Sequence, residues 1–96
     1  MTIELKKFGT TLLSRHTGKE ASVAFQTSLK NISEQEDILA NFEGVITFSP
    51  SWGHEFLKPL TQHYGTRFKL LRTDNPSVKA TLEILEKSHG MHFNII

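Results

Sequence analysis

The fold is decided by the stretch Val45-Ile46-Thr47-Phe48-Ser49-Pro50-Ser51-Trp52-Gly53-His54-Glu55-Phe56-Leu57. Its pattern predicts the end of a buried strand, a tight turn at Ser49-Pro50, and a helix whose first residue is Ser51. A serine at such a junction turns its hydroxyl toward the free backbone N–H groups of the helix, where negative charge is favoured. Ser51 can therefore be a helix cap, a nucleophile or a phosphate acceptor.

Length and composition limit the function classes. The chain has 96 residues, near the common size of one domain, so we expect a single domain over residues 1–96. It has no cysteine, which excludes a disulfide framework and a thiolate metal site, and its first residues resemble no export signal; we expect a cytoplasmic protein. The formal net charge is +1, and no apolar run approaches the ~18 residues of a membrane span. We therefore expect neither nucleic acid nor a membrane as a partner.

The N-terminal third contains one turn signal and one helix-start signal. Ile3 and Leu5 alternate with polar neighbours, and Thr10-Thr11-Leu12-Leu13 follow a turn signal at Gly9. This pattern predicts an N-terminal β-hairpin. The run Thr17-Gly18-Lys19-Glu20 has the form of a capping box, and apolar residues at helical spacing follow it. We therefore expect a first helix over residues 18–31.

The middle and end of the chain alternate between strand and helix patterns. Residues 38–42 form a short, nearly continuous apolar run, which predicts a central strand covered on both faces. After the second helix, Gly65 is a stop signal, and residues 67–72 predict another strand. Asn75-Pro76 then supplies a cap and a proline at the first helical position, and this third helix should stop at Gly90.

Residues 92–96 alternate well enough to form a last, edge strand. Its apolar end, Phe93-Asn94-Ile95-Ile96, could pair with a second copy of the chain, which leaves a homodimer open. The element order is then ββαβαβαβ, with about five strands and about three main helices. This order predicts an α/β domain with a mixed sheet, whose parallel strands are joined by right-handed crossovers.

A serine hydrolase is the leading enzymatic alternative. The run Ser49–Gly53 matches the nucleophile elbow G-x-S-x-G except at its first position, and it lies in the expected strand-turn-helix context. Asp74 and either His89 or His92 follow in the order of a hydrolase triad. A sheet of about five strands lacks the additional loops that build an oxyanion hole and a substrate pocket, so we expect a non-catalytic role.

Other chemistry is less well supported. His54-Glu55 begins the zinc motif H-E-x-x-H, but Lys58 occupies the position of the second histidine. His89 and His92 have no third ligand nearby in the sequence, and no glycine-rich phosphate loop occurs. Trp52 has two readings, a core anchor at the start of a helix or an exposed aromatic contact for a protein partner.

Several runs carry a family resemblance. The segment Ile38–Val45, followed by Phe48–Phe56, resembles the central signature of the bacterial STAS-like domain of unknown function. That signature is a hydrophobic strand ending in DFEGV, then a serine, an aromatic residue, a small residue and a glutamate. Weaker similarities to the family's opening and to the start of its last helix lie in Phe8-Gly9, Leu12, Ser14-Arg15, Gly18 and Asn75-Pro76-Ser77-Val78. The resemblance therefore spans nearly the whole chain.

The resemblance implies the STAS fold, a mixed sheet flanked by helices, which anti-sigma factor antagonists share. In those regulators a GHKL-type kinase, the anti-sigma factor, phosphorylates a serine at the start of the helix after a central strand, and phosphorylation abolishes binding. Their signature D-S-S/T-G falls on Pro50-Ser51-Trp52-Gly53, so the resemblance implies Ser51 as the phosphoacceptor. Pro50 replaces the aspartate of that signature, and Asn41 stands where the STAS-like family usually has an aspartate.

We therefore expect a non-catalytic protein-interaction and signalling module without cofactor or metal. The expected partner is a protein, a GHKL-type ATPase or kinase, and phosphorylation of Ser51 would switch its binding. The expected partner-binding residues are Ser49, Pro50, Trp52, Gly53, His54 and Glu55. The alternative is a small serine hydrolase-like enzyme that uses Ser51 at a strand-turn-helix elbow.

Overall fold

The computed structural model describes residues 1–96. It is an α/β fold with three α-helices and six short strands, one strand more than expected. The elements in chain order are β1 (Thr2–Glu4), the 3-10 helix η1 (Leu5–Phe8), β2 (Thr11–Leu12), α1 (Arg15–Leu29), β3 (Ile38–Asn41), β4 (Thr47–Phe48), α2 (Pro50–Tyr64), the 3-10 helix η2 (Gly65–Arg67), β5 (Phe68–Leu70), α3 (Pro76–His89) and β6 (Asn94–Ile95).

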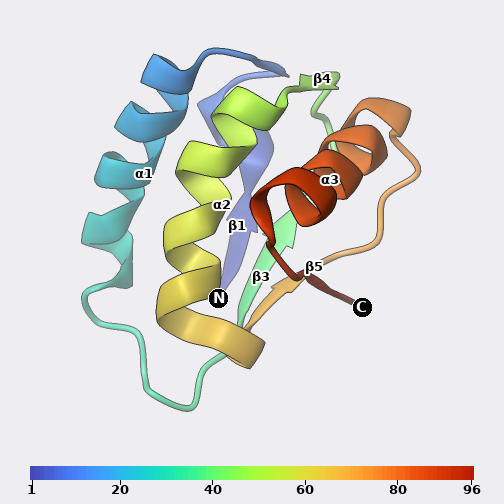
Figure 1. Ribbon diagram of the computed structural model, residues 1–96. Coiled ribbons are helices and arrows are strands. Elements are labelled where there is room, and N and C mark those ends of the chain that lie inside the picture. Colours follow the sequence, from blue (N-terminus) through green and yellow to red (C-terminus); the bar gives the residue numbers. More distant parts are fainter.

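The main sheet has four strands in the order β1-β3-β5-β6, and all three pairings are parallel. Each connection moves the chain one strand further in the same direction, so right-handed crossovers place every helix on the same face. Figure 1 shows this arrangement, with α1, α2 and α3 in one layer in front of the strands and α2 in the middle. The expected edge position of the last strand, β6, is confirmed.

The predicted N-terminal hairpin and mixed sheet are wrong. Strand β1 pairs with β3, and β2 pairs with β4 in a separate two-stranded sheet, again in parallel. The 3-10 helix η1 stands between the two strands and buries Leu5 completely, while Gly9 after it has φ 128°. The chain therefore turns into the core between β1 and β2 instead of folding back on itself.

The chain after β3 leaves the main sheet because α3 holds it by side chains. The Asn75 amide donates hydrogen bonds to the carbonyls of Val45 (2.7 Å) and Ile46 (3.2 Å). The Ser77 hydroxyl accepts from the Phe48 N–H (3.0 Å) and donates to its carbonyl. Residues 45–48 thus lie against the N-terminus of α3, and only residues 47–48 form a strand, paired with β2.

The central strand β3 is covered on one face only, not on both as predicted. Ile38 and Ala40 are fully buried beneath the helices, whereas Leu39 and Asn41 on the opposite face are half-buried. Because all crossovers lie on one side, no helix covers the second face. The continuous apolar run therefore correctly predicted a strand with buried residues, but the prediction that helices cover both of its faces was wrong.

The core is one cluster between the helix layer and the sheet. Its centre is aromatic: Trp52 stacks on Phe56 with ring centroids 5.0 Å apart, and Phe48 meets Trp52 edge-on at 5.8 Å. Aromatic pairs in such offset or edge-to-face arrangements stabilise a core beyond the area they bury. Helix α2 buries Trp52, Phe56 and Leu60 in this cluster.

The helix ends follow the sequence signals in α3 but not in α1. Asn75 caps α3, with Pro76 at its first position and Gly90 in the left-handed conformation after its last. Helix α1 begins at Arg15 rather than near residue 18, because Ser14 and not Thr17 is its cap. None of the helices has the length and apolar character needed to cross a membrane.

Candidate functional site

The candidate site is the N-terminus of α2, and its cap is Ser49 rather than Ser51. The Ser49 hydroxyl accepts a hydrogen bond from the Trp52 N–H (3.2 Å) and donates to the carbonyl of Leu13. Pro50 occupies the first helical position, so Ser51 is the second residue of the helix. The capping role considered for Ser51 is therefore wrong. A cap residue has non-helical backbone angles and precedes the first helical residue, whereas Ser51 lies within the helix.

Ser51 is half-buried, and its hydroxyl takes no part in the hydrogen bonds that close the helix end. The free backbone donors at this end are few. Pro50 has no N–H, the Trp52 N–H bonds to the Ser49 hydroxyl, and the Gly53 N–H bonds to the Ser49 carbonyl at 2.9 Å. The N–H of Ser51 itself is the one left at the mouth of the helix, beside its own side chain.

Basic side chains surround the next turns of the same helix face. Residues three, four and seven positions after a helical residue share its face, so His54, Glu55 and Lys58 follow Ser51 along α2. Arg15, the first residue of α1, forms an ion pair with Glu55 at 2.8 Å. This pair links the starts of the two helices and occupies the one carboxylate in the group.

His54 lies against His89, which ends α3, with ring centroids 4.5 Å apart. Its Nδ1 atom is buried without a hydrogen-bond partner. Burial is the main cause that lowers the pKa of His54, and the positive charges of His89, Lys58 and Arg15 lower it further, while Glu55 acts in the opposite direction. His54 is therefore held in its neutral form more strongly than a free histidine.

The expected partner-binding residues divide into two groups. Ser49, Pro50, His54 and Glu55 are half-buried and reach the surface, as does Ser51. Trp52 is 1% exposed and Gly53 is also buried, so neither residue is available to a partner.

The core-anchor reading of Trp52 is the correct one. A Cβ atom on Gly53 would lie 2.9 Å from the Phe48 ring and 3.2 Å from Leu85, which is why a glycine packs there. Helix α2 thus turns Trp52, Gly53, Phe56 and Leu57 to the core, while Ser51, His54 and Glu55 reach the surface.

The geometry of a serine hydrolase is not assembled. The nucleophile elbow is a strained turn, but Ser51 lies in regular helix, and no residue other than glycine has a positive φ. Asp74 precedes α3 and His89 ends it, so about 20 Å of helix separates them. His92 lies beyond the same end as His89. The triad that the sequence order allowed therefore does not meet at Ser51.

No group of three or more His, Cys, Asp or Glu side chains is arranged to hold a metal ion. The sequence pointed to His89 and His92 as a pair, whereas the structure pairs His89 with His54. No local pattern could have revealed this contact, because the two histidines belong to different helices.

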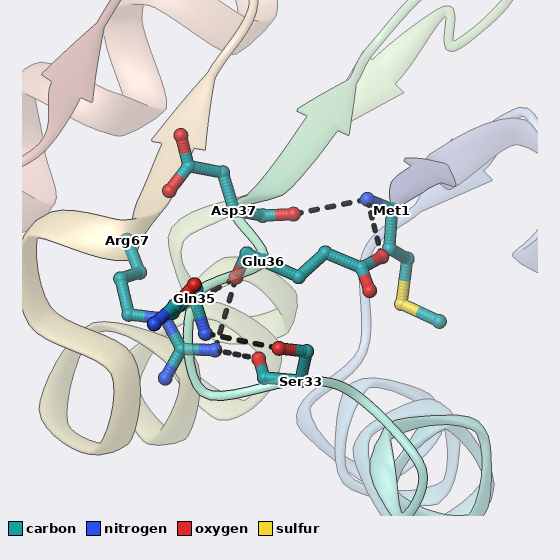
Figure 2. Close-up of polar contacts among 6 residues, drawn as sticks. All are labelled: Met1, Ser33, Gln35, Glu36, Asp37 and Arg67. Carbon is teal, nitrogen blue, oxygen red and sulfur yellow. Dashed lines mark hydrogen bonds and ion pairs between the residues drawn. The ribbon is translucent and has the colours of Figure 1, made fainter.

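A second polar cluster, missed in the sequence, lies at the opposite end of the sheet (Figure 2). The Arg67 guanidinium donates to the carbonyl of Ser33 and, from Nε and Nη2, to that of Glu36 at 3.2 and 3.0 Å. The amine of Met1 bonds to the Asp37 carbonyl and to the Glu36 carboxylate, each at 2.9 Å. These bonds hold the loop between α1 and β3 against η2, so we assign the cluster a structural role.

Comparisons with known proteins add no relative. No protein-family model matches the chain, and no curated protein or solved structure matches it.

Proposed function

We propose that this chain is a non-catalytic protein-interaction module, in which phosphorylation of Ser51 switches the binding of a partner. The proposal follows the resemblance to the STAS-like domain and to anti-sigma factor antagonists. The partner is then a GHKL-type ATPase or kinase, which contacts the surface formed by Ser49, Pro50, Ser51, His54 and Glu55.

The observation that carries the proposal is that Ser49, and not Ser51, makes the hydrogen bonds at the start of α2. Ser49 makes the hydrogen bonds that start α2, and its loss would damage the helix. Ser51 makes none of them and reaches the surface. A kinase can therefore modify Ser51 without destroying the fold, which is the property a reversible switch requires.

Charge supports the same residue. A phosphate on Ser51 would add about −1.5 to −2 charges at the positive end of the helix dipole. The free N–H of Ser51 and the positive charges of Lys58 and Arg15 can then act on it. The unmodified surface carries more basic than acidic groups, so it suits an acidic partner patch. Phosphorylation would reverse that match and weaken binding.

The experiment uses the purified chain, ATP and GHKL-type serine kinases from the source genome. Intact-mass measurement should show the gain of one phosphate, and Ser51→Ala should abolish it. Ser28→Ala, an exposed serine of α1, is the matched control and should leave it unchanged. Ser51→Asp should weaken binding to the same kinase at least about tenfold, equivalent to ~1.4 kcal/mol.

Two results would refute the switch. One is a phosphate that persists in Ser51→Ala; the other is unchanged binding by Ser51→Asp in a chain that still folds. The hydrolase alternative predicts instead ester turnover that Ser51→Ala removes without unfolding the protein. Because no histidine forms a hydrogen bond with Ser51 and the triad residues do not meet there, we do not propose hydrolysis as a second function.

A further inference from the structure

A cleft of about 440 Å³ opens between the C-terminal halves of α1 and α2. It lies at the far end of α2 from Ser51, so its role is independent of the proposed switch. Clefts of about 300–1,000 Å³ are the size that proteins use for small ligands. We propose that it binds a small amphiphilic carboxylate, a molecule with an apolar body and one acidic group.

The cleft exists because the two helices touch at one end and separate at the other. At Gly18 the backbones are so close that a Cβ atom there would lie 2.8 Å from the Trp52 carbonyl oxygen. About two turns further, the rings of Phe25 and Phe56 stand between the helices with centroids 6.0 Å apart. Close contact at one end and bulky side chains at the other leave an open wedge.

The walls of the wedge suit an apolar body. Phe25, Leu29, Phe56 and Leu60 line it, and Phe56 belongs to the aromatic centre of the core. Phe25 is only half-buried, so part of its ring faces the open space. An aliphatic chain or an aromatic ring seated there would remove this surface from water, which is the main source of affinity in such sites.

The mouth of the wedge suits a negative group. Lys30 and His63 line it, neither takes part in an ion pair, and no carboxylate is among the lining residues. Both lie near helix C-termini, each of which has a partial charge of about −0.5 that solvent screens. Among the residues that line the cleft, Lys30 carries the one full charge, and this charge is positive.

The single tryptophan provides the assay. Trp52 stacks on Phe56, whose ring lies 6.0 Å from that of Phe25, so a ligand against Phe25 should change Trp52 fluorescence. The intact chain is titrated with decanoate, decanol and decylamine, each below its micelle concentration. We expect saturable binding in the order decanoate, decanol, decylamine. Amide chemical-shift changes should fall in residues 22–30 and 56–64.

Charge variants test which groups recognise the acid. Lys30→Ala should weaken decanoate binding about two- to fivefold, the range of an exposed ion pair, and His63→Ala should weaken it less through the loss of a hydrogen-bond donor; both should leave decanol binding unchanged. Lys19→Ala and His16→Ala are matched controls on the exposed surface of α1 and should have no effect. Both test residues lie at the surface, so folding should survive.

Three outcomes would overturn the proposal. The first is the absence of saturable binding by decanoate. The second is decanol binding as tight as decanoate, with no loss in Lys30→Ala or His63→Ala, which would show an apolar hollow without acid recognition. The third is a set of shift changes away from the two helix segments. None of these outcomes bears on phosphorylation of Ser51, so the two proposals fail separately.

Discussion

Replacing Gly18 with alanine tests the close approach of α1 and α2, on which both the core and the cleft depend. The added Cβ would lie 2.8 Å from the Trp52 carbonyl oxygen, 3.0 Å from its Cα and 3.2 Å from its carbonyl carbon. Ordinary contacts between such atoms are about 3.5–4.0 Å. All three obstructing atoms are backbone, so no side chain can rotate away, and the helices must move apart by roughly 0.5–1 Å.

Two opposing energies decide the outcome. Overpacking of a well-packed site costs about 1–3 kcal/mol, and backbone obstruction favours the upper part of this range. Alanine is the better helix former by about 1 kcal/mol, which offsets part of the strain. We therefore expect Gly18→Ala to lower the free energy of unfolding by roughly 1–2 kcal/mol.

Urea unfolding followed by Trp52 fluorescence and by far-ultraviolet circular dichroism measures this change. A loss of that size should lower the midpoint by about 1 M, given slopes of roughly 1–3 kcal/mol/M. Ser28→Ala, an exposed change in the same helix, is the control and should stay within about 0.5 kcal/mol. If Gly18→Ala proves as stable as the original chain, or more stable, the two backbones are not in contact and the reasoning fails.

Three further perturbations test other contacts. Asn75→Ala should cost about 2–4 kcal/mol in urea unfolding, because it removes the α3 cap and two bonds to residues 45–46, while Asn75→Asp should retain the cap and lose less. Arg67→Lys should speed amide hydrogen exchange in residues 33–37, since lysine cannot reproduce the guanidinium fork; unchanged exchange would contradict the clamp. The folded state lowers the pKa of His54, so the unfolded chain binds its proton more readily, and stability should fall as the pH drops below about 6.5. His54→Gln should reduce this fall between pH 8 and pH 5, and equal urea midpoints for the two proteins at each pH would contradict the assignment.

Much of the local structure was predictable because its causes are local. The cap Asn75-Pro76 and the stop at Gly90 follow from residues a few positions apart. The α/β class follows from alternating periods in the chain. The edge position of the last strand was also predicted correctly.

The errors in strand pairing have one physical source. A strand pattern shows that apolar and polar side chains alternate, but contacts with distant segments decide which other strand it pairs with. Residues 10–13 looked like the second arm of a hairpin, yet β2 pairs with residues 47–48 in parallel. The apolar run at residues 38–42 predicted a strand covered on both faces. Because all crossovers lie on one side of the sheet, no helix covers its other face.

The candidate site divides in the same way. The sequence alone indicated a serine at the start of the second helix, because Ser49-Pro50-Ser51 directly follows the apolar strand that ends at Phe48. Ser49-Pro50 carries the same local signal as Asn75-Pro76, a cap followed by a proline at the first helical position, so the sequence could have identified Ser49 as the cap. Only the tertiary structure adds the bond from Ser49 to the carbonyl of Leu13. The contact of His54 with His89 and the wedge between α1 and α2 likewise arise only when the helices pack, because nothing within one helix encodes its distance from another.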